Sequence, residues 1–261
     1  MLHILQLLAK ILVILVLVTS SAVAASTPVQ MQAEKLVWMT EEYPPYNFHD
    51  GNGRLIGISV DILVEIMRRM DIPFSREDIY VIPWARGYRE TLNNPDAALF
   101  TMTMSDYRKD LFTFVGPILP SRISVVTVNA DYKINSLNDL IGLNVGAVRN
   151  DIGEQLLNKH GLAHVAKVKL PTSLEVIRML LLKRIDAVAI DESIAKYEFN
   201  RLGVTKDQFQ IRMTLEELTT HFAFNLKVSA DFINAFSETF NQLTAEGYTD
   251  SVFEKYGVST K

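Results

Sequence analysis

The stretch AALFTMTMSDYRKDLFTFVGP, residues 97–117, opens with an apolar run and then passes through a charged turn to Arg108. The run AALFTMT (97–103) is the third of three apolar segments, after KLVWMT (35–40) and IYVIPW (79–84). Amphipathic patterns with helical spacing separate the three segments. The order strand, helix, strand, helix, strand is typical of a parallel α/β sheet with right-handed crossovers.

A second α/β unit follows without a low-complexity linker, with predicted strands LNVGAV, HVAKVKL and DAVAI between helical patterns. Two β-rich stretches, 122–128 and 221–226, bracket this unit. If both stretches run between the units, the second lobe is inserted in the first, and the stretches form a hinge. We therefore predict an α/β protein of two lobes, each a mostly parallel sheet flanked by helices. Lobe 1 is expected from residues 34–121 and 222–261, and lobe 2 from 122–221.

The N-terminus has the pattern of a secretory signal peptide. MLHILQLLAK carries one lysine, ILVILVLV is an unbroken apolar core, and TSSAVAAS supplies small residues around a cleavage site. We expect a signal peptide over residues 1–25, cleaved after Ala24 or Ala25, and a mature protein in the periplasm. The alternative is a membrane anchor, but Lys10 leaves about 13 apolar residues, short of the roughly 20 that span a bilayer.

The composition excludes several classes of function. The 261 residues carry a formal net charge of −4 and no basic run, so a nucleic-acid partner has no electrostatic support. Without cysteine, the chain has no disulfide, thiolate metal site or cysteine nucleophile. The five histidines show no metal-site spacing, and no P-loop, GxGxxG or GxSxG occurs. We predict no catalytic residue, no metal, no cofactor and a monomer.

Arg108, Thr101 and Thr103 lie at the carboxyl end of a predicted strand, where α/β sheets bind ligands. The arginine side chain can hold a carboxylate through two parallel N–H groups. Side chains alternate along a strand, so both threonines are expected to face the same side, toward one small ligand. From the spacing alone, a surface arginine beside ordinary strand threonines stays open as the alternative.

Aromatic residues follow the first two predicted strands of lobe 1. Tyr43 and Tyr46 flank a proline pair after the first strand, and Trp84 with Arg86 follows the second. Rigid aromatic rings at such positions can stack on the apolar or cationic part of a ligand. The alternative is that these rings only pack against the loop or the core.

Two polar segments follow predicted strands of lobe 2. VRNDIGEQL opens a helix, and the N–H groups of a helix N-terminus bind carboxylates. Asp151 in this segment has the alternative role of capping the helix, whereas Arg149 has no capping chemistry. Asp191 ends the strand DAVAI, where its carboxylate can take a ligand ammonium group or cap the next helix.

These segments together resemble the family 3 extracellular solute-binding proteins, the periplasmic receptors for polar amino acids that feed ABC importers. TEEYPPYNF resembles the family's first strand and aromatic loop, and TMTMSDYRKDLFTFVGPI resembles its T-x-x-R…F-s-x-P signature. GISVDILVEIMRRM, LNDLIGLNVGAV and LLLKRIDAVAIDES are similar to three further family elements. The resemblance covers about Leu36 to Tyr256 and implies a type II periplasmic binding protein fold with two hinge strands.

The resemblance also implies roles for single residues. Arg108 would hold the ligand α-carboxylate with help from Thr101 and Thr103. Asp191 would take the α-ammonium group, and Tyr43 would stack on the ligand side chain. Trp84 falls where relatives have a pocket wall.

The segment VRNDIG departs from the family, whose members usually carry Gly-Thr or Gly-Ser-Thr there to help hold the carboxylate. Arg149 and Asp151 lie in the replaced segment. The segment IPWARGY, which contains Arg86, is also unusual for amino-acid receptors of the family. We expect Arg149 and Arg86 to add positive charge near the cleft and so to favour an acidic or otherwise anionic ligand.

The predicted function is therefore non-enzymatic. The lobes would close on a small polar ligand, an amino acid or a related molecule, for delivery to an ABC permease in the inner membrane. Three alternatives remain open at this point. They are a ligand-sensing partner of a membrane signalling receptor, a periplasmic dehydratase-type enzyme on the same fold, and a structural envelope protein without a small ligand.

Overall fold

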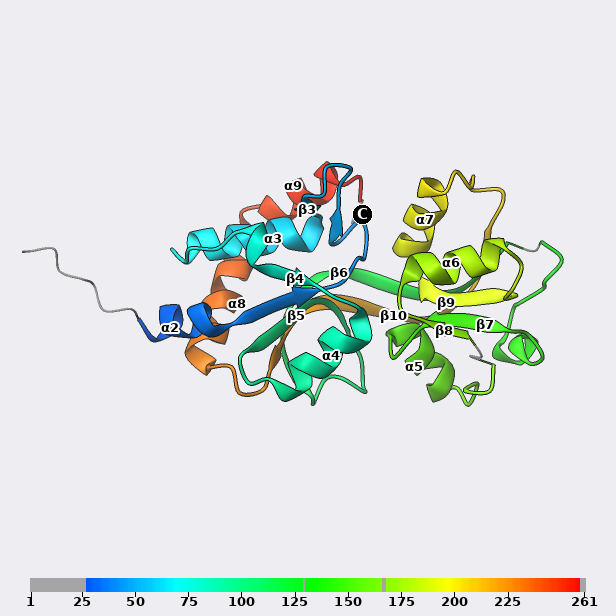
Figure 1. The fold of residues 1–261 in the computed structure, drawn as a ribbon, viewed down its shortest axis with the longest axis horizontal. Helices are drawn as coiled ribbons and strands as arrows, with labels where there is room; N and C mark the ends of the chain where they lie inside the picture. The colour runs from blue at the N-terminus through cyan, green and yellow to red at the C-terminus, as the bar shows by residue number, and fades with distance from the viewer. Residues whose placement is uncertain (1–26, 129, 166–167, 259–261) are drawn as a thin grey trace, which may run out of the picture.

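The computed structural model describes residues 27–128, 130–165 and 168–258 (Figure 1). The expected signal peptide, residues 1–25, lies outside the described residues. Among the helices that are described, none combines the length and the apolar character needed to cross a membrane.

Eight strands form one sheet in the order β4-β1-β5-β10-β6-β9-β7-β8. The first half of the sheet, β4, β1 and β5, is parallel, and so is the second half, β9, β7 and β8. This arrangement confirms the predicted α/β class with mostly parallel pairing. The strands are β1 (Val37–Thr40), β4 (Ile79–Val81), β5 (Ala97–Met104), β6 (Phe112–Thr127), β7 (Val145–Val148), β8 (Val168–Leu170), β9 (Ala187–Asp191) and β10 (Gln210–Asn225), with a small separate hairpin of β2 (Phe48–His49) and β3 (Leu55–Ile56).

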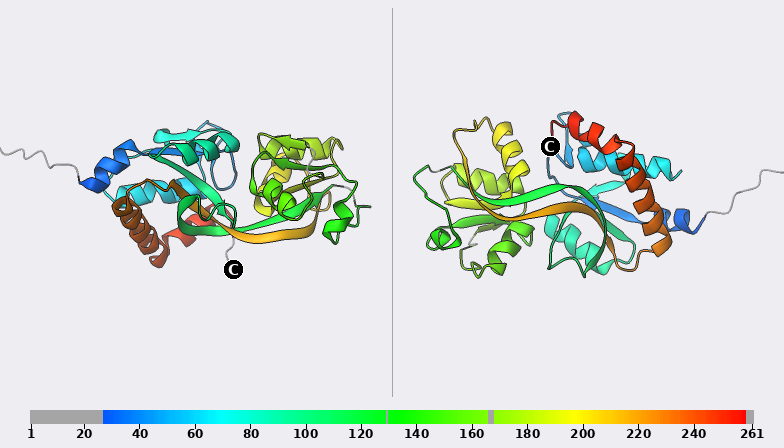
Figure 2. Two further views of the ribbon diagram at one scale, coloured as in Figure 1. Left: turned by 90° about the horizontal axis from the view of Figure 1, so that it is seen from below. Right: turned by 180° about the vertical axis from the view of Figure 1, so that it is seen from behind.

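The antiparallel pair β6 and β10 joins the two halves of the sheet. The strands have 16 residues each and pair from Gln210 opposite Thr127 to Asn225 opposite Phe112. Figure 2 shows both strands running through the two halves of the molecule. The β-rich stretches expected at 122–128 and 221–226 are therefore one end of each strand. The predicted lobe boundaries fall inside these two strands and stay a prediction.

Helices cover both faces of each half of the sheet (Figure 1). In the first half, α3 and α9 lie on one face and α4 on the other, while in the second half α6 and α7 lie opposite α5. Residues 137–140 form only a short 3₁₀ turn, and helix α2 precedes the first strand. The helices are α2 (Pro28–Lys35), α3 (Ile58–Arg69), α4 (Trp84–Asn93), α5 (Ile152–Lys159), α6 (Ser173–Leu181), α7 (Glu192–Arg201), α8 (Ala230–Ala245) and α9 (Tyr248–Lys255), with 3₁₀ turns η1 (Arg76–Asp78) and η2 (Leu137–Leu140).

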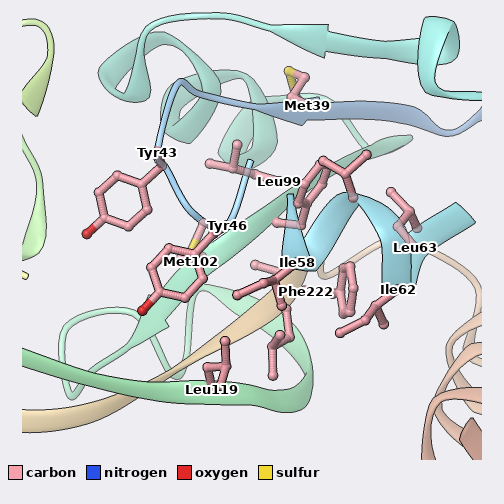
Figure 3. Close-up of a cluster of buried hydrophobic side chains, with 14 of the residues drawn as sticks. Met39, Tyr43, Tyr46, Ile58, Ile62, Leu63, Leu99, Met102, Leu119 and Phe222 are labelled. Carbon is pink, nitrogen blue, oxygen red and sulfur yellow. The ribbon is translucent and has the colours of Figure 1, made fainter. Parts of the chain in front are cut away.

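An aromatic core holds the central strands of the first half in place. Trp38 of β1 stacks on Phe236 of α8 with the ring centroids 5.6 Å apart, and it meets Phe224 of β10 edge-on at 5.5 Å. Figure 3 shows this core where it reaches the loop after β1, with Ile58 and Phe222 among its members. Close packing of this kind leaves little freedom to the strand ends, so the residues that follow β1 and β5 are held rigidly.

Candidate ligand-binding site

Arg108 follows β5 and lies fully buried where the two halves of the molecule meet. One terminal nitrogen donates to the carbonyl oxygen of Thr103 at 3.2 Å, and the other lies 3.4 Å from Oδ1 of Asp151. The guanidinium also lies over two rings, with Cζ 4.8 Å from the centroid of Trp84 and 5.5 Å from that of Tyr88. The alternative of a surface arginine is therefore wrong.

Two further contacts join the halves. Nε1 of Trp84, the first residue of α4, donates to the carbonyl oxygen of Asn150 at 3.0 Å. The ring of Phe48 in β2 lies 5.4 Å from that of Tyr197 in α7. The loops after β1, β4 and β5 therefore face the loops after β7 and β9.

Asp151 stands at the N-cap position of α5, but its side chain makes no capping hydrogen bond. The carboxylate faces Arg108 instead, with its side chain 14% exposed. Burial raises the pKa of Asp151, and the positive charge of Arg108 opposes this effect. Asp151 thus holds the N-cap position without the usual side-chain cap, and its carboxylate is part of the contact between the halves.

Asp191 ends β9 and caps α7. Its Oδ1 accepts hydrogen bonds from the backbone N–H groups of Ser193 at 2.8 Å and Ile194 at 3.2 Å. Its Oδ2 accepts from the hydroxyl of Ser121 in β6 at 2.8 Å. Burial nevertheless raises the pKa of Asp191 to about 6. The capping role is confirmed, and a role toward a ligand ammonium group stays a prediction.

Tyr43 and Tyr46 form a stacked pair, with centroids 5.7 Å apart and ring planes 24° from parallel. A tight turn fixes their spacing, because the N–H of Tyr43 donates to the carbonyl oxygen of Asn47 at 2.7 Å. Both rings are buried, and Figure 3 shows them at the edge of the apolar cluster with their hydroxyls directed away from Ile58 and Leu63. Burial raises the pKa of Tyr43, and the negative charge of Asp191 and then of Asp151 raises this pKa further.

Glu41 directly follows β1 and was not predicted as a site residue. The residue is only 8% exposed, and no hydrogen bond to its carboxylate is found within the described residues. Burial and then the negative charge of Asp151 raise the pKa of Glu41 well above its ordinary value, while Arg108 lowers it. Glu41 lies at the carboxyl end of a strand, where α/β sheets bind ligands. The rule that identifies Arg108 could therefore have identified Glu41 as well.

Thr101 interrupts the simple alternation expected along β5. The pairing of β5 with β10 shifts at this point, and Thr101 has a positive φ of 61°. Its hydroxyl donates to Oδ1 of Asn47 at 2.5 Å and lies 2.8 Å from Oγ of Ser59. Thr101 therefore braces the loop after β1, while Thr103 supplies the carbonyl oxygen that holds Arg108. The bulge at Thr101 interrupts the alternation, so the spacing alone does not align its hydroxyl with that of Thr103.

Arg86 and Arg149 do not join the other candidates. Arg86 is exposed and lines a surface pocket beside β1 and β4, together with Tyr80 and Glu90. Arg149 is exposed, and its terminal nitrogen donates to the carbonyl oxygen of Lys169 in β8 at 3.2 Å. Neither side chain is among the contacts between the halves, and the expectation that these arginines add positive charge near the cleft stays a prediction.

The contact between the halves thus gathers three carboxyl groups, one guanidinium and two kinds of aromatic ring. We call this set the junction, which comprises Glu41, Tyr43, Trp84, Arg108, Asp151 and Asp191. In the part of the chain that the structure describes, no group of three or more histidine, aspartate or glutamate side chains is placed to hold a metal ion. The chemistry available at the junction is hydrogen bonding, charge pairing and ring stacking.

The sequence matches a family model, that of the bacterial extracellular solute-binding proteins, family 3, over residues 36–259. Two curated proteins are similar to the chain at 24% identity. One is a probable histidine-binding protein of Campylobacter jejuni, aligned over 82% of this chain and 81% of its own length. The other is the L-cystine-binding protein TcyJ of Escherichia coli, aligned over 85% of this chain and 81% of its own length.

Solved structures share the arrangement of elements. A mutant of ArgBP from T. maritima superposes with a TM-score of 0.74 at 20% identity, covering 87% of this chain and 96% of its own. A histidine kinase sensor domain with similarity to periplasmic binding proteins gives a TM-score of 0.76 at 20% identity, covering 87% and 98%. At this identity the likeness shows the fold alone.

Proposed function

Because the chain belongs to the bacterial extracellular solute-binding proteins of family 3, we propose that its two lobes capture a small polar solute, an amino acid or a close relative of one. The fold is that of a type II periplasmic binding protein, as the sequence predicts. We assign residues 34–121 and 222–261 to lobe 1 and residues 122–221 to lobe 2.

The observation that carries this proposal is the complete burial of Arg108 between the halves. Its Nε has no hydrogen-bond partner among the described residues. Buried polar groups in proteins are almost always hydrogen-bonded, so an unpaired guanidinium N–H at a contact between lobes supports a role in holding a solute. Asp191 across the junction has a buried carboxylate that can accept further hydrogen bonds, which supports a role toward an ammonium group.

Entry of a solute requires the lobes to move apart. Tyr43, Arg108 and Asp191 are each at most 4% exposed, so no solute reaches them while the halves are in contact. Of the described strands, β6 and β10 join the two halves and supply the hinge. A solute that contacts both lobes stabilises the closed state, since only that state completes its contacts.

The proposed setting is the periplasm, with delivery of the solute to an ABC permease and without chemical conversion. The family membership supports binding as the activity, and the names of the histidine- and cystine-binding relatives support an amino-acid solute. An anionic solute is not proposed, because Arg86 and Arg149 lie outside the junction.

Substitution of Arg108 tests the proposal. We expect Arg108→Ala to weaken binding by about 2–5 kcal/mol for a solute that binds the parent protein, because a buried charge then loses its partner. Calorimetric titration with the common amino acids identifies the solute and measures the loss. Arg86→Ala is the matched control, since this exposed arginine lies outside the junction, and it should bind like the parent. A folded Arg108→Ala variant with parental affinity would remove the basis of the assignment.

A further inference from the structure

The junction holds more negative than positive charge. Glu41, Asp151 and Asp191 are carboxyl groups, and Arg108 is the one cation among the junction residues defined above. Burial raises the pKa of each of these three carboxyl groups, and a positively charged solute beside them would favour their ionised forms, which together carry three negative charges against the one positive charge of Arg108. Taking unpaired charge out of water is unfavourable, so a closed junction favours a solute that reduces this surplus.

Polar atoms without partners show where such a solute would lie. The hydroxyl of Tyr43, a residue 4% exposed, has no hydrogen-bond partner within the described residues, and neither has the carboxylate of Glu41. Burial raises the pKa of Tyr43, and the negative charges of Asp191, Asp151 and Glu41 raise it further. A solute with several N–H donors could bond the carboxylate of Glu41 and the oxygen of Tyr43, while the buried Nε of Arg108, a donor without a partner among the described residues, could take one acceptor of the same solute.

Asp151 already supplies a carboxylate to Arg108. Its Oδ1 lies 3.4 Å from a terminal nitrogen of the guanidinium, and a second guanidinium nitrogen donates to the carbonyl oxygen of Thr103. A solute carboxylate near Arg108 therefore meets the negative charge of Asp151. A solute ammonium or guanidinium group is attracted by the carboxyl groups of the junction and must keep away from Arg108, which already lies over the ring of Trp84, so the ring of Tyr43 suits it better.

We propose that the junction selects an organic cation, a solute with a protonated amine or guanidinium group and net positive charge, and that Asp151 sets this preference. This inference rests on the proposed function, because it takes the junction to be the solute site. It names the charge class of the solute and assigns the selection to the residue at which the chain departs from its resemblance to the family.

A panel of six solutes tests the charge class on the mature chain by calorimetry at neutral pH. L-lysine and L-arginine are cations with a carboxylate, while cadaverine and agmatine are the matching amines without one. L-glutamine and L-glutamate supply the neutral and anionic comparisons. We expect at least one cation to bind about 10-fold or more tightly than glutamine, and glutamate not to bind. We expect each amino acid to bind more tightly than its matching amine, because the unpaired Nε of Arg108 can donate to a solute carboxylate. Tighter binding of the amine would contradict the role of Arg108 while leaving the charge class standing.

The variant Asp151→Asn tests whether Asp151 sets the preference for a cationic solute. We expect the affinity ratio of the best cation to glutamine to fall by about 10-fold, since a negative charge beside the solute is lost. Asp110→Asn removes the same charge from an exposed position in the loop after β5, and its ratio of cation affinity to glutamine affinity should stay within about twofold of the parent.

An unchanged ratio of cation affinity to glutamine affinity in a folded Asp151→Asn variant would overturn the role of Asp151. Tighter binding of glutamine or glutamate than of every cation would overturn the charge class and leave the proposed function standing. Failure of all six solutes to bind would overturn the charge class, whereas the proposed function is decided by the titration with the common amino acids.

Discussion

Asp191 accepts three hydrogen bonds, yet burial raises the pKa of its carboxyl group to about 6 from an ordinary value of 3.8. A carboxyl group with a raised pKa favours the folded state when it is protonated. Its contribution is therefore complete below pH 3.8 and is lost as the pH rises through 6. The loss amounts to about 3 kcal/mol at neutral pH.

The variant Asp191→Asn makes this titration measurable. We expect the parent to lose about 3 kcal/mol of unfolding free energy relative to the variant between pH 4 and pH 7, because asparagine keeps a capping oxygen without titrating. Urea unfolding of both proteins at the two pH values gives the difference. Glu41 and Asp151 titrate in both proteins, so their contributions largely cancel. If the difference in unfolding free energy between the parent and the variant does not change with pH, burial does not raise the pKa of Asp191.

The sequence patterns identify most junction residues at or shortly after strand ends, but they miss Glu41, which directly follows β1, and they fail where side-chain direction matters. Arg108 and Asp191 were identified because strand ends in α/β sheets meet at one edge, and the structure buries both residues there. Arg86 and Arg149 also follow strands, but their side chains leave the junction, and residue spacing does not contain that direction. Glu41 was missed because an acidic residue beside a loop is ordinarily solvated.

At the scale of elements, the first turn of α5 decides where Asp151 lies. Gly153 sits so close to β9 that a Cβ atom there would lie 2.2 Å from the carbonyl oxygen of Ala189. The obstructing atom is backbone in a buried strand, so it cannot rotate away. The close approach of α5 to β9 brings Asp151 and Asn150 to the first half of the molecule.

Gly153→Ala should therefore displace the start of α5. We expect a loss of unfolding free energy of about 1–3 kcal/mol from overpacking, together with weaker solute binding because Asp151 shifts from Arg108. Urea unfolding and calorimetry measure the two effects. Gly51→Ala is the control, since nothing lies within 4 Å of an added Cβ at that position. If Gly153→Ala matches Gly51→Ala in both measurements, the helix start does not depend on this approach.

Most elements agree with the patterns in the sequence, but the two long strands do not. The first ten residues of β6 include Gly116, Pro117 and Pro120, residues that ordinarily interrupt strands. In β10, Ile211, Met213 and Leu215 alternate with polar residues, but the alternation breaks at Glu216-Glu217, and the strand before Thr220 is mostly only half-buried. Pairing along their full length, from Gln210 opposite Thr127 to Asn225 opposite Phe112, stabilises both strands. Such long-range pairing is absent from local sequence patterns.

At the scale of the whole molecule, contacts on two sides hold the halves together. Arg108 meets Asp151 and Trp84 meets Asn150 near α4 and α5, while Phe48 meets Tyr197 near α7. Lys159 of α5 also lies 3.7 Å from Asp106, a pair that salt should weaken because Asp106 is 69% exposed. These contacts must separate before a solute reaches the junction, so the protein must also populate an open state in which the two lobes lie apart.

The distance between the halves in solution tests this requirement most directly. The chain has no cysteine, so Arg89→Cys on α4 and Asn158→Cys on α5, both exposed positions, can carry a spin-label pair without competing sites. Pulsed electron resonance then gives the distance distribution with and without a solute shown to bind by calorimetry. We expect a longer-distance population without solute, its collapse to one shorter distance with saturating solute, and no such collapse when Arg108→Ala is added. A single distribution that a bound solute leaves unchanged would contradict capture by closure of the two lobes.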